Sequence, residues 1–189
     1  NLLFDSVRGA TKWLSSNSIT QEGTIASSLT SFDSNGFSLG ADPSGSNEGW
    51  NRNGDSHVAW CWKAGGTAVS NTDGTITSTV SANQDSGFSI VKYTANATSG
   101  ATIGHGLNQE LDLLIVKSTN LGQAWNVYVK DVTDTSSKYL RLNETSSISD
   151  LITANSRFIP NNFTDSVFSV GNDNSTNGKD VMGSFTVAK

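Results

Sequence analysis

The residue types that most often carry chemistry are scarce in this chain of 189 residues. Its only histidines are His57 and His105, and its only cysteine is Cys61. A catalytic triad or a zinc site needs acidic, sulfur or nitrogen partners at fixed spacing around such residues. Neither histidine has partners at that spacing. The sequence therefore predicts no catalytic residue, no metal ligand and no enzymatic activity.

Each of these residues also has a structural explanation, which we favour. Cys61 stands between two tryptophans in an alternating segment. A buried, inert cysteine is the more common case there, because reactivity needs an accessible and electropositive setting. Glycines on both sides of His105 predict that it fills a tight turn.

Carboxylates gather in two loop regions: Asp33, Asp42 and Glu48 in one, and Asp165, Asp173 and Asp180 in the other. Calcium is the cation that such oxygen-rich loops suit, but the D-x-D-x-D-G spacing is missing. Glycoside hydrolysis needs two carboxylates converging across a cleft. We expect plain solvated loops and no cofactor, with calcium binding and hydrolysis as weaker alternatives.

The five tryptophans are candidates for a sugar-binding platform, because an exposed ring can stack on a pyranose face. Four of them stand in predicted strands and are expected in the core: Trp13, Trp60, Trp62 and Trp125. Trp50 instead lies in the polar loop GSNEGWNRNGD, where nothing favours burial. The sequence therefore assigns Trp50, with Arg52 beside it, as the candidate ligand-binding residues.

Composition excludes several classes of protein. Apolar residues make up 35% of the chain and charged residues 15%, both below the usual shares, and Ser, Thr, Asn and Gly replace them. Five Trp and eight Phe argue against disorder. A net charge of −5 makes nucleic acid an unsuitable partner, and no apolar run is long enough to cross a membrane.

Alternation of apolar and polar residues predicts an all-β fold. Asn-Gly and Asp-Gly pairs mark turns between many of the predicted strands, and one weak pattern at 146–158 predicts a short helix. Short strands at this spacing are typical of a β-sandwich or jelly roll. The predicted strands are 2–7, 12–16, 36–40, 57–64, 75–80, 87–94, 111–118, 124–131, 138–143, 166–171 and 181–188.

Three alignments within the chain indicate an internal repeat. Residues 1–17 align with 127–143, matching Trp13 to Tyr139. Residues 32–40 align with 163–171, matching Phe37 to Phe168, and RNGDSHVAWCW aligns with TNGKDVMGSFT at its Asn-Gly pair. Both matched aromatic pairs are expected in a core.

The repeat divides the chain into three parts. Residues 1–64 are interpreted as the C-terminal half of a first repeat, and 87–189 as a complete second repeat. Between them, 65–86 is a Gly-, Ser- and Thr-rich linker with a short strand. The front half of the first repeat is expected to precede Asn1, and the open strand edges of this half are expected to invite pairing.

Several stretches resemble a repeat family in long structural proteins of marine bacteriophages: FDSVRGATKWLSSN, SLTSFDSNGFSLG, VAWCWKAGGTAVSNTDGTITSTVSAN, GFSIVKYTANATSGATIGHGL and KYLRLNET. The resemblance covers nearly the whole chain and implies a concanavalin-like sandwich without catalytic residues. Where that family ends its repeat on an aromatic-rich strand, the second copy here has VMGSFTVAK. This departure leaves the C-terminal boundary of the repeat open.

The resemblance implies a virion structural protein at the particle surface, a decoration or fibre module. We expect it to act by self-association and by docking to other virion proteins. The alternative is a carbohydrate-binding module of a host-recognition fibre or adhesin, with surface glycan as its partner. A glycan hydrolase is the third candidate.

Overall fold

The computed structural model describes residues 1–41, 49–131, 138–145, 149–150, 157–178 and 184–188, with backbone only for 149–150 and 184–188. Fifteen strands and one 3-10 helix lie in this part of the chain: β1 Leu2–Asp5, β2 Gly9–Ser15, β3 Gly23–Thr24, β4 Leu29–Asp33, β5 Gly36–Leu39, β6 Val69–Asn71, β7 Ser78–Asn83, β8 Phe88–Tyr93, β9 Ala101–Gly104, β10 Leu113–Ser118, β11 Asn126–Val129, β12 Lys138–Arg141, β13 Ser149–Asp150, η1 Pro160–Asn162, β14 Val167–Val170 and β15 Ser184–Ala188.

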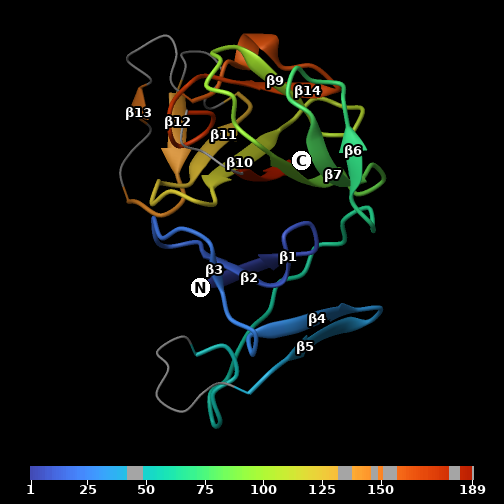
Figure 1. Cartoon of the computed structure of the whole chain (residues 1–189), viewed down its shortest axis with the longest axis vertical. Coiled ribbons are helices and arrows are strands. Elements are labelled where there is room, and N and C mark those ends of the chain that lie inside the picture. Colours follow the sequence, from blue (N-terminus) through green and yellow to red (C-terminus); the bar gives the residue numbers. More distant parts are fainter. Residues whose placement is uncertain (42–48, 132–137, 146–148, 151–156, 179–183, 189) are drawn as a thin grey trace.

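The fold is an all-β sandwich built around one large sheet. Its eight strands run in the order β13-β12-β11-β10-β15-β8-β7-β6, and every neighbouring pair is antiparallel. The pair β9–β14 covers one face of this sheet, and the sheet β1-β2-β3 lies against the other (Figure 1). Beyond it lies the hairpin β4–β5, so the layers stack along the long axis.

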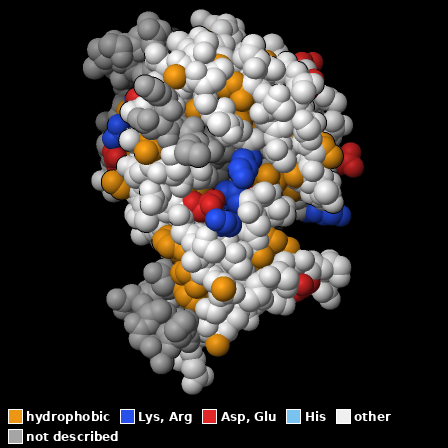
Figure 2. Space-filling view, in the orientation of Figure 1, with side chains coloured by type: hydrophobic (Ala, Val, Ile, Leu, Met, Phe, Trp, Pro, Cys, Tyr) orange, Lys and Arg blue, Asp and Glu red, His pale blue; other side chains and the backbone are white. Residues whose placement is uncertain are grey.

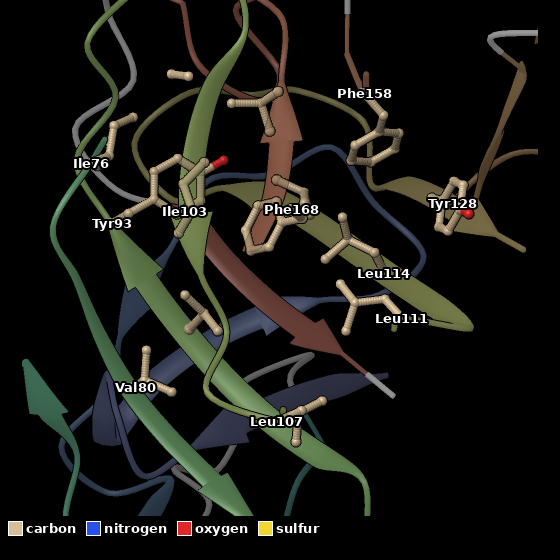
Figure 3. Packing of buried hydrophobic residues seen from close by; sticks show 14 of the residues in the cluster. Ile76, Val80, Tyr93, Ile103, Leu107, Leu111, Leu114, Tyr128, Phe158 and Phe168 are labelled. Carbon is tan, nitrogen blue, oxygen red and sulfur yellow. The ribbon is translucent and has the colours of Figure 1, made fainter. Parts of the chain in front are cut away.

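The main core lies between the large sheet and the β9–β14 pair. Strand alternation sends Val91 and Tyr93 of β8 into this core with Leu114 of β10. Phe168 of β14 sits at the centre of the cluster, near Tyr93 and Ile103 (Figure 3). The predicted core positions of Tyr139 and Phe168 are confirmed, because both are buried.

A second, smaller core joins the β1–β3 sheet to the outer face of the large sheet. Leu14 of β2 is fully buried there against Ile90 and Trp125, with Leu3 and Ile115 packed around them. The N-terminal layers are therefore fixed to the sandwich by burial of apolar side chains.

Hydrogen bonds add to this junction. The indole Nε1 of Trp125 donates to the carbonyl oxygens of Ser15 and Ser18, at 2.9 and 3.1 Å. The ammonium group of Lys117 donates to the carbonyl of Ile19 from the same side of the sheet. Both donors are buried, so the loop after β2 supplies acceptors that would otherwise face water.

The internal repeat is not confirmed by the structure. Strands β1-β2-β3 and β11-β12-β13 share one pairing order, and Lys12 faces Thr24 as Lys138 faces Asp150. The next matched segments differ, because β5 pairs with β4 whereas β14 pairs with β9.

Two expectations tied to the repeat also fail or fall short. Phe37 is exposed on the β4–β5 hairpin, where no layer of the described residues covers it, so its predicted core position is wrong. Trp13 is only half-buried and packs across Gly23 on the neighbouring strand, where an added Cβ would come within 2.4 Å of its ring. The segment interpreted as a linker contains β6 and β7 of the large sheet.

Some of the other predictions of secondary structure are confirmed and some are wrong. Most predicted strands are present with shifted ends, while β3, β4, β6, β9 and β13 were not predicted as strands. The predicted strand at 57–64 is wrong, because these residues pair with no strand among the described residues. Of the short helix predicted at 146–158, residues 149–150 form β13 instead, and 146–148 and 151–156 lie outside the described residues.

Candidate interaction surface

The most unusual part of the surface is the segment 55–65, called here the unpaired segment. It contains no turn, bend or strand pairing, and it runs from the Asn53–Gly54 turn to the bend at Gly66. Its residues 55–63 are all exposed. No backbone hydrogen bond joins residues 56–62 to any other described residue. Such a backbone presents donors and acceptors to solvent in the manner of an open sheet edge.

Apolar side chains alternate along this segment and face solvent. The exposed fractions are 81% for Val58, 76% for Trp60 and 65% for Trp62. These three residues, called here the tryptophan strip, share one face if the segment is extended. The expectation that Trp60 and Trp62 are core residues is therefore wrong, because both rings remain mostly exposed to solvent.

The C-terminal end of the unpaired segment is anchored to the large sheet. Trp62 stacks on Phe88 of β8 with ring centroids 6.4 Å apart. The side-chain amide of Asn83 donates to the carbonyl of Lys63 at 3.1 Å. Gly65 lies so close to β7 that an added Cβ would come within 1.9 Å of the carbonyl oxygen of Ala82. The strip therefore projects from a fixed base.

Near the other end lie Trp50 and Arg52, the two residues that the sequence assigns to ligand binding, and they differ in burial. Trp50 is only 8% exposed, so its expected role as an exposed contact residue is wrong, and its polar loop turns the ring inward. The Nε1 of Trp50 finds no hydrogen-bond partner among the described residues. Arg52 remains exposed, and its Nη2 lies 2.7 Å from Oδ2 of Asp55. The structure does not bring Trp50 and Arg52 together as one ligand platform.

Cys61 and the two histidines differ in burial. Cys61 is exposed, so its predicted burial is wrong, and it shares the unpaired segment with the exposed His57. His105 follows β9 and is fully buried, with Gly106 at φ 72° after it. Its Nδ1 accepts a hydrogen bond from the amide of Leu107 at 3.3 Å, and burial lowers the pKa of the imidazole. The arrangement supports the turn and offers no accessible base.

A hollow of about 350 Å³ lies elsewhere, between the segment that precedes β10, the strand β11 and the 3-10 helix η1. Tyr128 and Phe163 form part of its wall, with ring centroids 4.9 Å apart. The ion pair of Lys130 and Glu110 also lines it. An aromatic wall beside a charged pair and the amide of Asn161 could hold a small polar ligand such as a sugar.

The carboxylates predicted to cluster in loops make local contacts instead. Asp33 accepts hydrogen bonds from Ser31 and Ser38, and Asp173 accepts from Ser175. Asp42, Glu48 and Asp180 lie outside the described residues. Within the described ranges, no group of three or more His, Cys, Asp or Glu side chains is placed to hold a metal ion. The same part of the chain has no helix with the length and hydrophobicity of a membrane span.

Figure 2 shows how little charge this face of the molecule carries. Most of the atoms belong to uncharged polar side chains or backbone, and charged side chains gather near the junction between the upper sandwich and the lower layers. Apolar side chains are visible near that junction and on the lower layers. Two features of the described residues are candidates for binding: the tryptophan strip, which the sequence predicts in the core, and the hollow beside η1.

Comparison with known proteins gives a family over almost the whole chain. Residues 1–187 match a family described as Domain of unknown function (DUF7483). The chain belongs to this family. No curated protein and no solved structure matches it. The family match therefore covers both the sandwich and the N-terminal layers. The description of the family gives no function, so the role of this domain has to be inferred from its surface.

Proposed function

We propose that this domain is a structural module of a bacteriophage particle, a surface, decoration or fibre component. It works by associating with copies of itself and by docking to other virion proteins at the particle surface. The resemblance of its sequence to repeats of phage structural proteins supports the setting. The tryptophan strip is the observation that supports the mode of action.

The exposed strip gives association a favourable free energy. Val58, Trp60 and Trp62 leave most of their surface in water, and burial of apolar surface is worth roughly 25 cal/mol per Å². Tryptophan is also enriched at the centres of protein interfaces. Because the neighbouring backbone has unpaired donors and acceptors, a partner gains hydrogen bonds as well as apolar contact. Such a surface favours assembly.

The test is the state of association of the purified domain. We expect the wild-type protein to form dimers or larger species as its concentration rises, measured by sedimentation velocity. The triple variant Val58→Ser, Trp60→Ser, Trp62→Ser should stay monomeric at the same concentrations. Leu142→Ser is the matched control, because Leu142 is an exposed apolar residue outside the strip, and it should associate like the wild type.

A wild-type protein that remains monomeric at every accessible concentration contradicts self-association. Placement in a particle is tested separately, by labelling purified virions of the source phage with an antibody against the domain. Absence of label from intact particles contradicts the virion role even if the isolated domain associates.

Carbohydrate binding is the second candidate, and one observation favours it. The indole of Trp60 is accessible on a segment whose base is anchored, which is the arrangement that stacking on a sugar ring requires. Binding of a soluble glycan that quenches or shifts tryptophan fluorescence in the wild type, and not in Trp60→Ser, would promote this candidate over assembly.

A further inference from the structure

We propose that the partner of the tryptophan strip is a second copy of this chain, paired antiparallel along the unpaired segment with Ala59 on the two-fold axis. The inference rests on the proposed function and specifies its partner and register. It follows from the side-chain order along residues 55–63.

When two copies pair antiparallel about one residue, the side chains of one face in both copies lie on the same side of the two-stranded ribbon. In an antiparallel pair centred on Ala59, Val58 stands opposite the partner's Trp60, and Trp62 opposite the partner's Ser56. Since side chains alternate with a period of two, the strips of both copies then lie on one face of the two-stranded ribbon. Aromatic residues paired with β-branched residues across strands are a stabilising combination.

Charge complementarity selects this register over its neighbour. With Ala59 on the axis, Lys63 stands opposite the partner's Asp55, and the same pair forms twice because a two-fold contact repeats every interaction. With Trp60 on the axis, Lys63 would stand opposite the partner's His57 instead. Asp55 uses its Oδ2 for Arg52, so its other oxygen remains free among the described residues to receive the ammonium group.

The surface removed from water is adequate for a reversible dimer. A buried tryptophan removes roughly 150–250 Å² from solvent, and a pair of copies brings four of them together. Because pairing across a two-stranded ribbon covers only part of each ring and Trp62 already stacks on Phe88, the total area removed from water is on the order of several hundred Å², which is the range of weak, transient contacts. The expected affinity is therefore micromolar, with rapid exchange between monomer and dimer.

Disulfide trapping tests the register directly. His57→Cys places a thiol opposite the partner's Cys61, and residues directly opposite in an antiparallel pair lie within reach of a disulfide. Within one chain, residues 57 and 61 are roughly 13 Å apart if extended, too far for a bond. We expect His57→Cys to give covalent dimers on mild oxidation, seen on non-reducing gels and by intact mass.

The matched control is the double variant His57→Cys, Cys61→Ser, whose only thiol lies about 13 Å from the partner's in this register. It should give at least tenfold less covalent dimer at equal concentration. Ala59→Cys, Cys61→Ser should cross-link readily, because its thiol lies on the axis. Circular dichroism checks that each variant keeps the wild-type β spectrum, and the substituted positions are exposed.

The outcomes separate the inference from the function on which it rests. If wild-type protein associates but His57→Cys and its control cross-link equally, or Ala59→Cys, Cys61→Ser does not cross-link, the register is wrong and self-association stands. If sedimentation shows only monomer, self-association itself is wrong. A glycan that protects Trp60 in a monomeric protein also overturns the second copy as occupant.

Discussion

Lys117 carries its ammonium group into the junction between the β1–β3 sheet and the large sheet. The side chain is fully buried, and its Nζ donates to the carbonyl oxygens of Ile19, Ser118 and Leu121 at 3.3, 2.7 and 3.2 Å. Burial lowers the pKa of this lysine to about 8. Because burial removes water from the charged ammonium group, the folded protein releases this proton more readily than the unfolded chain does, so the residue makes stability depend on pH.

The first prediction concerns that pH dependence. An unfolded lysine keeps its proton up to a pKa of 10.5, whereas the folded protein releases it at about 8. Between these values the unfolded state binds more protons, so this group makes the free energy of unfolding rise with pH. We expect Lys117→Met to remove a rise on the order of 1–2 kcal/mol, after allowance for solvent screening.

Urea unfolding at pH 7.5 and pH 10 measures the effect. Lys92→Met is the matched control, because Lys92 lies exposed on β8, and it should keep the wild-type dependence. Equal pH dependence in the wild type and in Lys117→Met would show that the buried amine has an ordinary pKa.

The second prediction concerns Trp125, whose indole joins the same two layers. Trp125→Phe keeps an aromatic ring in the smaller core but removes the donor for the carbonyls of Ser15 and Ser18. The carbonyl of Ser15 still accepts from the amide of Ser18, so the main loss is the hydrogen bond to the carbonyl of Ser18, worth about 1 kcal/mol. We expect that loss in the free energy of unfolding, measured by urea denaturation. Trp60→Phe, at an exposed ring, should change it by less than about 0.5 kcal/mol.

The tryptophans show which side-chain environments can be predicted from sequence. Trp125 was correctly placed in the core. Trp60 stands in an equally alternating segment but is exposed. Alternation indicates that one face of a segment is apolar, but it does not show whether another layer covers that face. Trp50 was placed outside by its polar neighbours, although a single ring can fold back from a polar loop. Burial therefore depends on contacts between distant segments.

At the scale of elements, the anchor of the unpaired segment depends on a close backbone approach. Gly65 lies against the carbonyl oxygen of Ala82, where a Cβ would come within 1.9 Å. The anchor also uses the hydrogen bond from Asn83 to the carbonyl of Lys63. One methyl group at position 65 should therefore separate the segment from β7.

The third prediction is that Gly65→Ala loosens the segment without unfolding the sandwich. Trypsin should cut after Lys63 roughly tenfold faster, because local opening controls access of the protease to the backbone. Gly36→Ala is the control, since an added Cβ there meets nothing within 4 Å, and its cleavage rate should match the wild type. An unchanged rate in Gly65→Ala would mean that the anchor lies elsewhere.

Strand prediction succeeded inside the large sheet and also for strands with a single neighbour, such as β1 and β5. Residues 87–94 and 111–118 were predicted, and β8 and β10 lie inside the large sheet. The 57–64 pattern is equally regular, but a strand also needs a partner, and no described residue provides one. The candidate interaction surface is therefore a segment with the sequence pattern of a strand but without a strand partner among the described residues.

At the scale of the whole molecule, the low charge of the surface determines how assembly responds to salt. Only 15% of the residues are charged, and the tryptophan strip carries no charge. Exposed ion pairs contribute at most about 1 kcal/mol and weaken as salt screens them. Apolar burial is not screened, and sulfate strengthens it.

The fourth prediction follows from this balance. We expect the dissociation constant of the self-associated domain to change by less than about tenfold between 0.05 and 1 M sodium chloride, measured by sedimentation equilibrium. Ammonium sulfate should tighten association. Loss of association at 1 M sodium chloride would mean that ion pairs, and not the strip, hold the copies together.

The position of β15 has a consequence for how the protein is made. Residues 184–188 lie between β8 and β10, in the interior of the large sheet. A ribosome synthesises both flanking strands long before it reaches these residues. During translation the sheet is therefore divided into two parts, with two facing edges and no strand to join them. The nascent chain can complete this sheet only after residue 188 has left the exit tunnel, so folding of the sandwich has to wait for synthesis of its last strand, β15.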